Sequence, residues 1–315
     1  MNKLILSLLF SLLCLSTHSK TVIHVGSIFN ADNGTLQPDM SILIEDDRVS
    51  EVIEGFIDPE ADDIYIDLSA YYVLPGLIDM HVHLTNQSSN NAYMERVTLN
   101  SADYAIRATK HAESTLLAGF TTVRNLGDSD SVTIALRNAI NNGIVVGPRI
   151  FSSGQTISST GGHGDSTNSL NLKLTSDLGP KEGVMNGEQE ALKSVRYRYK
   201  ENADLIKITA TGGVLSNAKD GQNPQMTVKE ISAIVSAAKD YGFKVAAHAH
   251  GAEGIKRATL AGVDSIEHGT LMDNEGAALM RENGTYYVPT LLAGKWVADK
   301  ALIPNYYPPF VEKKL

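Results

Sequence analysis

The sequence has one cysteine, Cys14, among its 315 residues. A single cysteine excludes an intrachain disulfide framework and any metal site built on cysteine ligands. Cationic side chains are outnumbered, and the net charge of -9 argues against nucleic acid or an anionic membrane as the main partner. Beyond the N-terminus, no apolar run is long enough to cross a membrane. The hydrophobic content of 43% nevertheless supports a large core and excludes a disordered chain.

The N-terminal segment has the layout of a secretory signal peptide. A lysine near the start precedes an apolar run over residues 4–15 and a small, polar stretch over residues 16–19. We therefore expect residues 1–19 to be a signal peptide and the protein to be secreted or periplasmic. A lipoprotein signal fits poorly because Leu13 precedes Cys14, and a buried N-terminal helix is the plain alternative. Cleavage would leave a mature chain without cysteine.

Residues 20–72 predict a small β domain. Short β-type runs at residues 21–25, 41–44 and 64–66 are separated by turn signals such as Asn33-Gly34. We expect them to form the N-terminal part of a small β-sandwich.

From residue 73 onward, strand-like and helix-like segments alternate. Seven apolar runs predict buried parallel strands, over residues 77–82, 120–125, 149–152, 204–209, 244–248, 265–267 and 286–289. Stretches with helical spacing that end near a glycine lie between them, over residues 101–118, 227–241, 252–261 and 274–282. The alternation predicts an α/β fold, a (β/α)8 TIM-type barrel over residues 73–315.

The predicted barrel has seven strands, whereas a barrel of this type closes with eight. The sequence stops at Leu315, so we expect a C-terminally truncated barrel with unpaired strand edges that favour aggregation. An extension of about a hundred residues would supply the missing βα unit and the closing elements. On this expectation the chain as written is poorly soluble or inactive. An inactive fragment, or at most a binding protein, is therefore one alternative to an enzyme.

Six of the nine histidines lie at strand ends or just beyond them, where barrel enzymes place their chemistry. His81 and His83 close the first barrel strand, and alternate residues of a strand point to the same side, so both can bind one metal ion. His248 and His250 end the fifth strand, and His268 ends the sixth. The spacing leaves open whether His248, His250 or both are ligands.

Two further residues carry candidate chemistry. Lys207 lies in the apolar run of the fourth strand, and a buried lysine needs a carboxylate partner or a changed chemical state. His163 lies in the glycine-rich loop after the third strand, where backbone can approach a ligand closely. It could orient a substrate or polarise a carbonyl, and a flexible linker is the plain alternative for its loop.

Several motifs together resemble the amidohydrolase superfamily: PGLIDMHVHL at 75–84, GFTTVRNLGD at 119–128, STGGHGD at 159–165, ADLIKITATGG at 203–213, VAAHAHGAEGIKRATLAGVDSIEHGT at 245–270 and YYVPTLLAG at 286–294. They are most similar to its metal-dependent dipeptidase branch. This branch contains Xaa-Pro and Xaa-Arg/Lys dipeptidases (also called zinc-dependent arginine carboxypeptidases) and is related to the imidazolonepropionases.

The resemblance implies a site for two divalent metal ions, expected to be Zn²⁺. His81 and His83 would bind the more buried ion, and His248 and His268 the other. Lys207, carboxylated on its amine by CO2, would bridge the two ions as a carbamate.

The resemblance also implies hydrolysis of the peptide bond of dipeptides or N-acyl amino acids, with release of a C-terminal amino acid. A hydroxide bridging the metals would attack the carbonyl. His163 would bind the substrate and polarise the scissile carbonyl, and His250 would contact the α-carboxylate. In the family the general acid–base is an aspartate at the end of the eighth strand. No match precedes Leu315, so the position of this aspartate stays open.

A cyclic-amide hydrolase similar to imidazolonepropionase, or a deaminase, is the alternative function. Mononuclear deaminases carry glutamate three residues after the fifth-strand histidine, and that position is Gly251. They also lack a bridging lysine, so Lys207 favours the binuclear site. We expect a small peptide or N-acyl amino acid as the partner, and a homo-oligomer is compatible with the sequence. A basic substrate preference would need an acidic pocket residue, for which Asp165 is a candidate.

Overall fold

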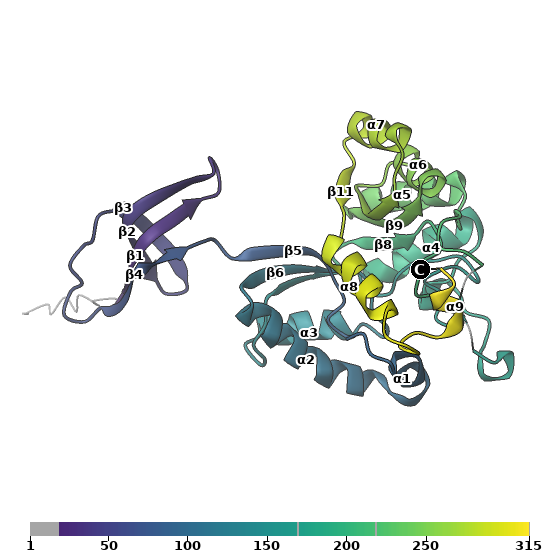
Figure 1. Ribbon diagram of the computed structural model, residues 1–315, viewed down its shortest axis with the longest axis horizontal. Helices are drawn as coiled ribbons and strands as arrows, with labels where there is room; N and C mark the ends of the chain where they lie inside the picture. The colour runs from purple at the N-terminus through teal and green to yellow at the C-terminus, as the bar shows by residue number, and fades with distance from the viewer. Residues whose placement is uncertain (1–18, 169, 218, 315) are drawn as a thin grey trace, which may run out of the picture. The chain divides into compact units, whose positions relative to one another are not determined.

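The computed structural model describes residues 19–168, 170–217 and 219–314 (Figure 1). The expected signal peptide, apart from Ser19, lies outside the described residues. The described chain divides into two compact units, one up to Gly76 and the other from Leu77. Within the described ranges, no helix combines the length and the apolar character that a membrane crossing requires.

The smaller unit contains one four-stranded sheet, in the order β3-β2-β1-β4. β2 pairs antiparallel with β1 and β3, whereas β4 pairs parallel with β1. Val25, Met40 and Ile42 form its small core. The three predicted runs lie within longer strands, and β3 was not predicted because charged residues interrupt its apolar ones at an exposed edge. The strands are β1 (Thr21–Asn30), β2 (Thr35–Glu45), β3 (Arg48–Glu54) and β4 (Ile64–Val73).

The larger unit contains all seven predicted barrel strands, and neighbouring strands pair in parallel. Two sheets, β5-β6-β7 and β8-β9-β10-β11, are joined by a parallel bridge between Ile157 and Ile208. The strands are β5 (Leu77–Val82), β6 (Phe120–Asn125), β7 (Arg149–Ser152), β8 (Ile206–Thr209), β9 (Val245–Gly251), β10 (Ser265–Leu271) and β11 (Tyr286–Val288). β9 and β10 run further than predicted, which places the fifth- and sixth-strand histidines inside strands.

Helices follow most of these strands and include the four that were predicted. Thr227 accepts a hydrogen bond from the backbone N–H of Glu230, so the predicted capping box is present. The helices are α1 (Ala92–Thr98), α2 (Ser101–Leu117), α3 (Val132–Asn141), α4 (Gly187–Lys200), α5 (Val228–Asp240), α6 (Ala252–Leu260), α7 (Asn274–Asn283), α8 (Leu291–Ala301) and α9 (Pro309–Glu312), with short 3-10 turns η1 (Leu172–Leu174) and η2 (Pro180–Glu182).

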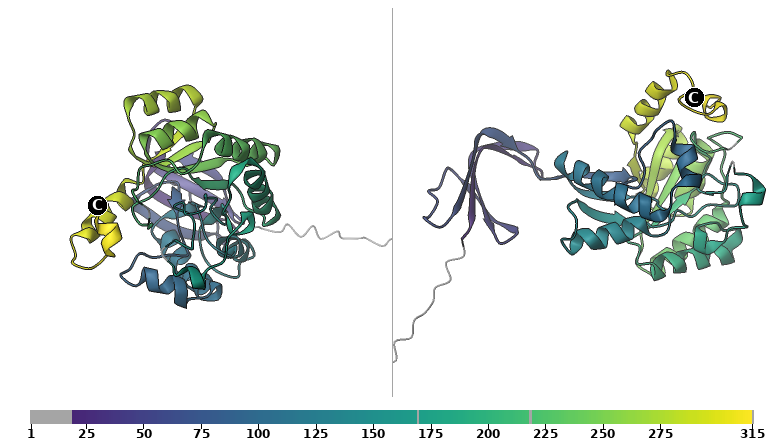
Figure 2. Two further views of the ribbon diagram at one scale, coloured as in Figure 1. Left: turned by 90° about the vertical axis from the view of Figure 1, so that its right-hand side faces the viewer. Right: turned by 90° about the horizontal axis from the view of Figure 1, so that it is seen from below.

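Several helices of the larger unit lie on the outside of its strands (Figure 2). α2 packs against β6, α3 against β7, and α6 against β9 and β10 (Figure 1). The largest core joins Ile231 and Ile234 of α5 and Ile255 of α6 to Ile208 of β8 and Ile266 of β10. This packing fixes the strands, so the side chains at their carboxyl ends are held on a rigid frame.

Candidate metal centre

The structure brings all six predicted histidines of the larger unit into one cluster. Their ring centroids form a connected chain of neighbours, with separations of 5.4 Å for His81–His83, 4.8 Å for His81–His268, 4.7 Å for His248–His268, 4.7 Å for His248–His250, 4.9 Å for His250–His268 and 4.2 Å for His163–His248. Residues distant in the sequence therefore meet at one end of the strands, as the predicted barrel requires.

The two histidines of β5 and its exit present the same ring nitrogen to the site. Nδ1 of His81 lies 2.9 Å from Oε2 of Glu267, and Nδ1 of His83 lies 3.2 Å from the carbonyl oxygen of Gly127. A carbonyl or carboxylate oxygen only accepts, so each Nδ1 carries the proton. The Nε2 lone pair of both rings is therefore free to bind a metal ion.

His248 presents the opposite nitrogen. Its Nε2 donates to the carbonyl oxygen of Gly212 at 2.9 Å, which leaves the Nδ1 lone pair free. Nδ1 of His268 contacts Oγ1 of Thr290 at 2.8 Å, so Nε2 is the ring nitrogen left for a ligand. Each of the four predicted metal-binding histidines thus has one nitrogen held by the protein and one available as a ligand, the usual arrangement at protein metal sites.

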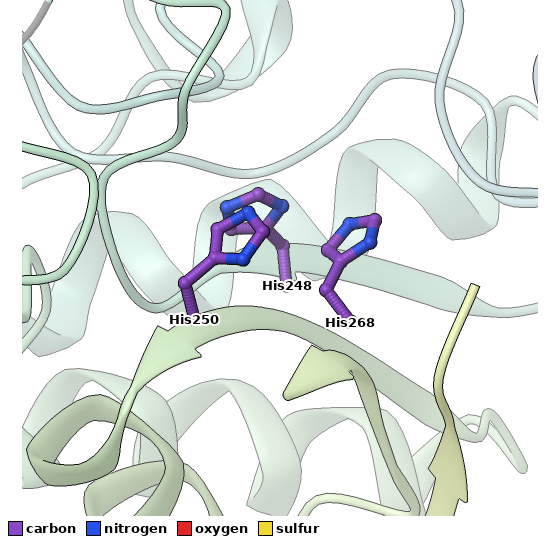
Figure 3. A group of neighbouring side chains, drawn as sticks. All are labelled: His248, His250 and His268. Atoms are coloured by element: carbon purple, nitrogen blue, oxygen red, sulfur yellow. The ribbon is translucent and has the colours of Figure 1, made fainter. Parts of the chain in front are cut away.

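His250 also lies among the candidate ligands (Figure 3). One ligand atom from each of His248, His250 and His268 lies within 4.8 Å of the others. The rings of His250 and His268 are nearly parallel, with an interplanar angle of 15°. Nδ1 of His250 contacts Oγ1 of Thr270 at 2.8 Å. His250 is therefore close enough either to bind metal with the other two or to contact a substrate beside them.

Lys207 fits a metal-bridging group better than an ion pair. Its side chain is 3% exposed, and its Nζ has no hydrogen-bond partner among the described residues. Burial, partly opposed by the Glu267 carboxylate, lowers the pKa of Lys207 to about 8. An unpartnered buried ammonium is costly, and a lowered pKa increases the fraction of neutral amine that can react with CO2. The predicted carbamate would turn this group into an anionic ligand.

The cluster holds its imidazoles in the neutral form that binds metals. Burial first, and then His250 and Lys207, lower the pKa of His163 to about 3. Burial and Lys207 lower the pKa of His250 to about 4. Burial first, and then Lys207, also lower the pKa of His83. The pKa values of the other three rings are lowered in the same direction, at His81, His248 and His268.

Acidification is expected to destabilise the metal-free protein. The folded-state pKa values of the buried rings lie below the unfolded value of about 6.5. The stabilisation that comes from keeping these rings neutral in the fold is therefore complete above that pH. It declines as pH falls toward the folded-state values of about 4 for His250 and about 3 for His163. Each fully desolvated ring contributes up to about 1.4 kcal/mol per pH unit. Urea unfolding at pH 7 and pH 5 measures the difference.

One variant assigns this effect to the cluster. His163→Gln should make the pH dependence shallower, because it removes one of the buried neutral rings. A free energy of unfolding that is equal at both pH values would contradict neutral burial of the histidines.

His163 is held by its loop and by a glycine. Its backbone N–H donates to Oε1 of Gln225 at 2.8 Å, and its ring stacks on His248 with an interplanar angle of 26°. A Cβ on Gly213 would lie 2.3 Å from Cε1 of this ring, so only glycine leaves room for it. Nδ1 of His163 is buried and has no hydrogen-bond partner within the described ranges. The ring is therefore positioned with an unused polar atom.

The other acidic residues considered from the sequence lie outside the cluster. Asp165 accepts hydrogen bonds from the backbone N–H groups of Gly161 and Thr167, at 2.8 and 2.9 Å, and so organises its own loop. Asp264 pairs with Lys244 before β10, and Asp273 caps α7. None of these three contacts one of the six histidines.

Sequence reasoning missed Glu267, Arg124 and Thr290. Glu267 directly precedes His268 in a buried strand run, and a buried carboxylate there is a signal that could have found it. Thr290 lies four residues before the end of the quoted motif at 286–294, but nothing in its spacing indicates a contact with His268.

Comparison with known proteins decides the family. The profile of the amidohydrolase family matches residues 72–305. The chain belongs to the amidohydrolase family. The (β/α)8 barrel is the fold of this family, which confirms the predicted fold class, and its members generally bind divalent metal ions.

Three similar proteins place the chain near the dipeptidase branch of the amidohydrolases. The ochratoxinase of Aspergillus niger is 30% identical over 289 residues, which cover 86% of this chain and 58% of the fungal protein. A crystal structure of a Xaa-Pro dipeptidase with methionine bound in its active site is 52% identical, with a TM-score of 0.89 over 94% of this chain and 72% of that one. A prolidase complexed with N-methylphosphonate-L-proline is 34% identical, with a TM-score of 0.84 over the same shares. These likenesses confirm the resemblance to the dipeptidase branch, although the chain spans less than two thirds of the length of ochratoxinase.

Proposed function

We propose that this amidohydrolase hydrolyses the peptide bond of dipeptides or N-acyl amino acids and releases a C-terminal amino acid. The proposal rests on one observation: the histidine cluster, in which hydrogen bonds fix a free lone pair on each of His81, His83 and His248, meets the unpartnered buried amine of Lys207 at the carboxyl ends of the strands. It is supported by the solved Xaa-Pro dipeptidase, which holds methionine in its active site, and by the prolidase complex with a phosphonate derivative of proline.

The protein groups that would hold the metals follow from these lone pairs. His81 and His83 would bind one divalent ion through Nε2, while His248 and His268 would bind the second. The carboxylated Lys207 would bridge the two. Bound Zn²⁺ ions would lower the pKa of a water molecule and polarise the scissile carbonyl.

The remaining site residues would bind and orient the substrate. A neutral His163 has one N–H to donate to the scissile carbonyl oxygen. Its buried Nδ1 has no hydrogen-bond partner among the described residues, so this atom is available to a substrate. In the tautomer whose Nδ1 accepts a hydrogen bond from the Thr270 hydroxyl, His250 carries its proton on Nε2. That N–H can donate to the α-carboxylate of a substrate. Glu267 is not free to transfer a proton because other groups occupy both of its oxygens.

A substrate panel tests the proposed function. The metal-reconstituted chain is assayed against dipeptides and N-acyl amino acids, and in parallel against an imidazolone and nucleobases. We expect amide hydrolysis with release of the C-terminal amino acid. Turnover of the second panel alone would favour the cyclic-amide hydrolase or deaminase alternative, and the absence of amide hydrolysis with metal bound would contradict the proposal.

Export is a separate proposal. We propose that residues 1–19 direct the chain out of the cytoplasm, because their sequence has the layout of a signal peptide. N-terminal sequencing of the exported protein should show cleavage near Ser19, and an intact N-terminus on cytoplasmic protein would contradict it.

Gly213→Ala is expected to displace the His163 ring and so to lower kcat for amide hydrolysis. Loss of one donor to a developing oxyanion costs about 10²–10³-fold in kcat. The metal content should not change, because the added Cβ would meet the ring of His163, which is not one of the predicted metal ligands. Steady-state kinetics together with metal analysis measure both effects. Gly294→Ala is the control, since a Cβ there meets nothing within 4 Å. Unchanged kcat in Gly213→Ala would remove His163 from catalysis.

A further inference from the structure

Glu267 is a carboxylate in the interior of the larger unit. It is 0% exposed, and it lies on β10 next to His268. Oε1 accepts hydrogen bonds from Nη2 of Arg124 at 2.7 Å and from the Ser265 hydroxyl at 2.6 Å. Oε2 accepts from Nδ1 of His81 at 2.9 Å. Both oxygens therefore have donors, and the charge is compensated by the guanidinium of Arg124.

Arg124 fixes the position of this carboxylate. Besides Glu267, it donates through Nε to the carbonyl oxygen of Met80 at 2.7 Å and through Nη1 to the Ser265 hydroxyl at 3.1 Å. Its side chain is 13% exposed. These contacts tie β6 to β5 and β10, which belong to different sheets. The carboxylate is thus held in one place by a rigid, planar donor.

The contact with His81 decides which nitrogen of that ring is a ligand. A carboxylate only accepts, so it keeps the His81 proton on Nδ1 and leaves the lone pair on Nε2. Without this acceptor the two neutral tautomers of a buried imidazole differ little, and the ring could carry its proton on Nε2. A ring in that state cannot bind a metal ion through Nε2.

We propose that Glu267 is a positioning residue that prepares His81 for metal binding by fixing its tautomer and ring orientation. The inference rests on the proposed function, in which His81 is a metal ligand. It gives the Arg124–Glu267 pair a role beyond stability. Replacing an outer partner of a metal-binding histidine typically lowers metal affinity about 10–100-fold.

The test compares Glu267→Gln with the unchanged chain. The glutamine keeps the shape, but its amide has one acceptor and one donor end. The acceptor end satisfies Arg124 and Ser265, so the NH2 faces His81 and favours a proton on Nε2. Nitrogen-15 NMR of histidine-labelled, metal-free protein should show His81 changing from the Nδ1–H to the Nε2–H tautomer. Chelator competition should show about 10–100-fold weaker Zn²⁺ binding.

Glu201→Gln is the matched control. Glu201 forms a 3.0 Å pair with Arg198, whose side chain is fully buried and lies outside the histidine cluster. This variant should lose stability but keep the His81 tautomer and the Zn²⁺ affinity. A Glu267→Gln protein with the original tautomer and affinity would reduce Glu267 to a structural ion-pair partner.

Glu267→Asp decides the matter if the glutamine variant does not fold. It keeps a negative charge for Arg124 but draws the carboxylate away from His81 by one methylene. We expect a folded protein with weakened Zn²⁺ binding, and unchanged binding would overturn the proposal. The tautomer measurement needs no metal and no substrate, so its result is independent of whether the proposed hydrolysis is observed.

Discussion

Lys207→Met is expected to abolish binding of at least one metal ion and to lower kcat/KM for dipeptide hydrolysis by more than about 10³-fold. The loss exceeds the 10–100-fold typical of outer-shell changes because a bridging ligand is removed. Stability should not fall, because the native Nζ is buried without a hydrogen-bond partner among the described residues and methionine fills a similar volume with an apolar chain. Metal analysis, kinetics and urea unfolding of the same preparation measure the three effects.

Lys244→Met provides the control for this substitution. Lys244 is an exposed residue that pairs with Asp264 at 2.8 Å, before the start of β9 and away from the histidines. The Lys244→Met protein should keep full metal content and activity. A Lys207→Met protein that retains two ions and turnover would show that Lys207 is an ordinary core residue and that no carbamate is needed.

His268→Asn and His250→Asn are expected to fail in different ways. His268→Asn should lose one metal ion and nearly all activity. His250→Asn should keep both ions and raise KM for substrates with a free α-carboxylate by about 10–100-fold, the effect of losing a hydrogen bond to a charged group. Metal analysis beside steady-state kinetics separates the two outcomes.

Asparagine suits this comparison because of the backbone at His268. The residue has a φ of +72°, in the left-handed region, and asparagine tolerates that region better than most residues. The fold of the variant should therefore survive, so metal loss can be assigned to the missing imidazole. If His250→Asn also loses an ion, the close group of His248, His250 and His268 is the metal site, and His250 is a ligand instead of a substrate contact.

Much of the site could be predicted because each barrel strand is recognisable from its local sequence, and the carboxyl ends of all barrel strands lie at the same face of the barrel. An apolar run that ends in histidine identifies both a buried strand and a residue at its carboxyl end, so the sequence predicts that His81, His248 and His268 lie together. β3 and α8 gave no comparable signal. The first is an edge strand with interrupted apolar residues, and the second is a helix with no buried residues.

The contacts that set the chemistry could not be predicted, since they join segments that are distant in the sequence. His81 and Glu267 are separated by 186 residues, and His83 depends on a backbone carbonyl at Gly127. Which nitrogen of each ring is free follows from these partners and from no local pattern. The role of His250 is equally a matter of tertiary geometry, because residues 248 and 250 share one side of a strand.

The most direct test of a binuclear, lysine-bridged centre is a crystal structure of the Zn²⁺-loaded chain, with the ions located by anomalous scattering at the zinc edge. We predict two ions, one beside His81 and His83 and one beside His248 and His268, with extra density on Nζ of Lys207 contacting both. A single ion held by His248, His250 and His268, above an unmodified lysine, would contradict it.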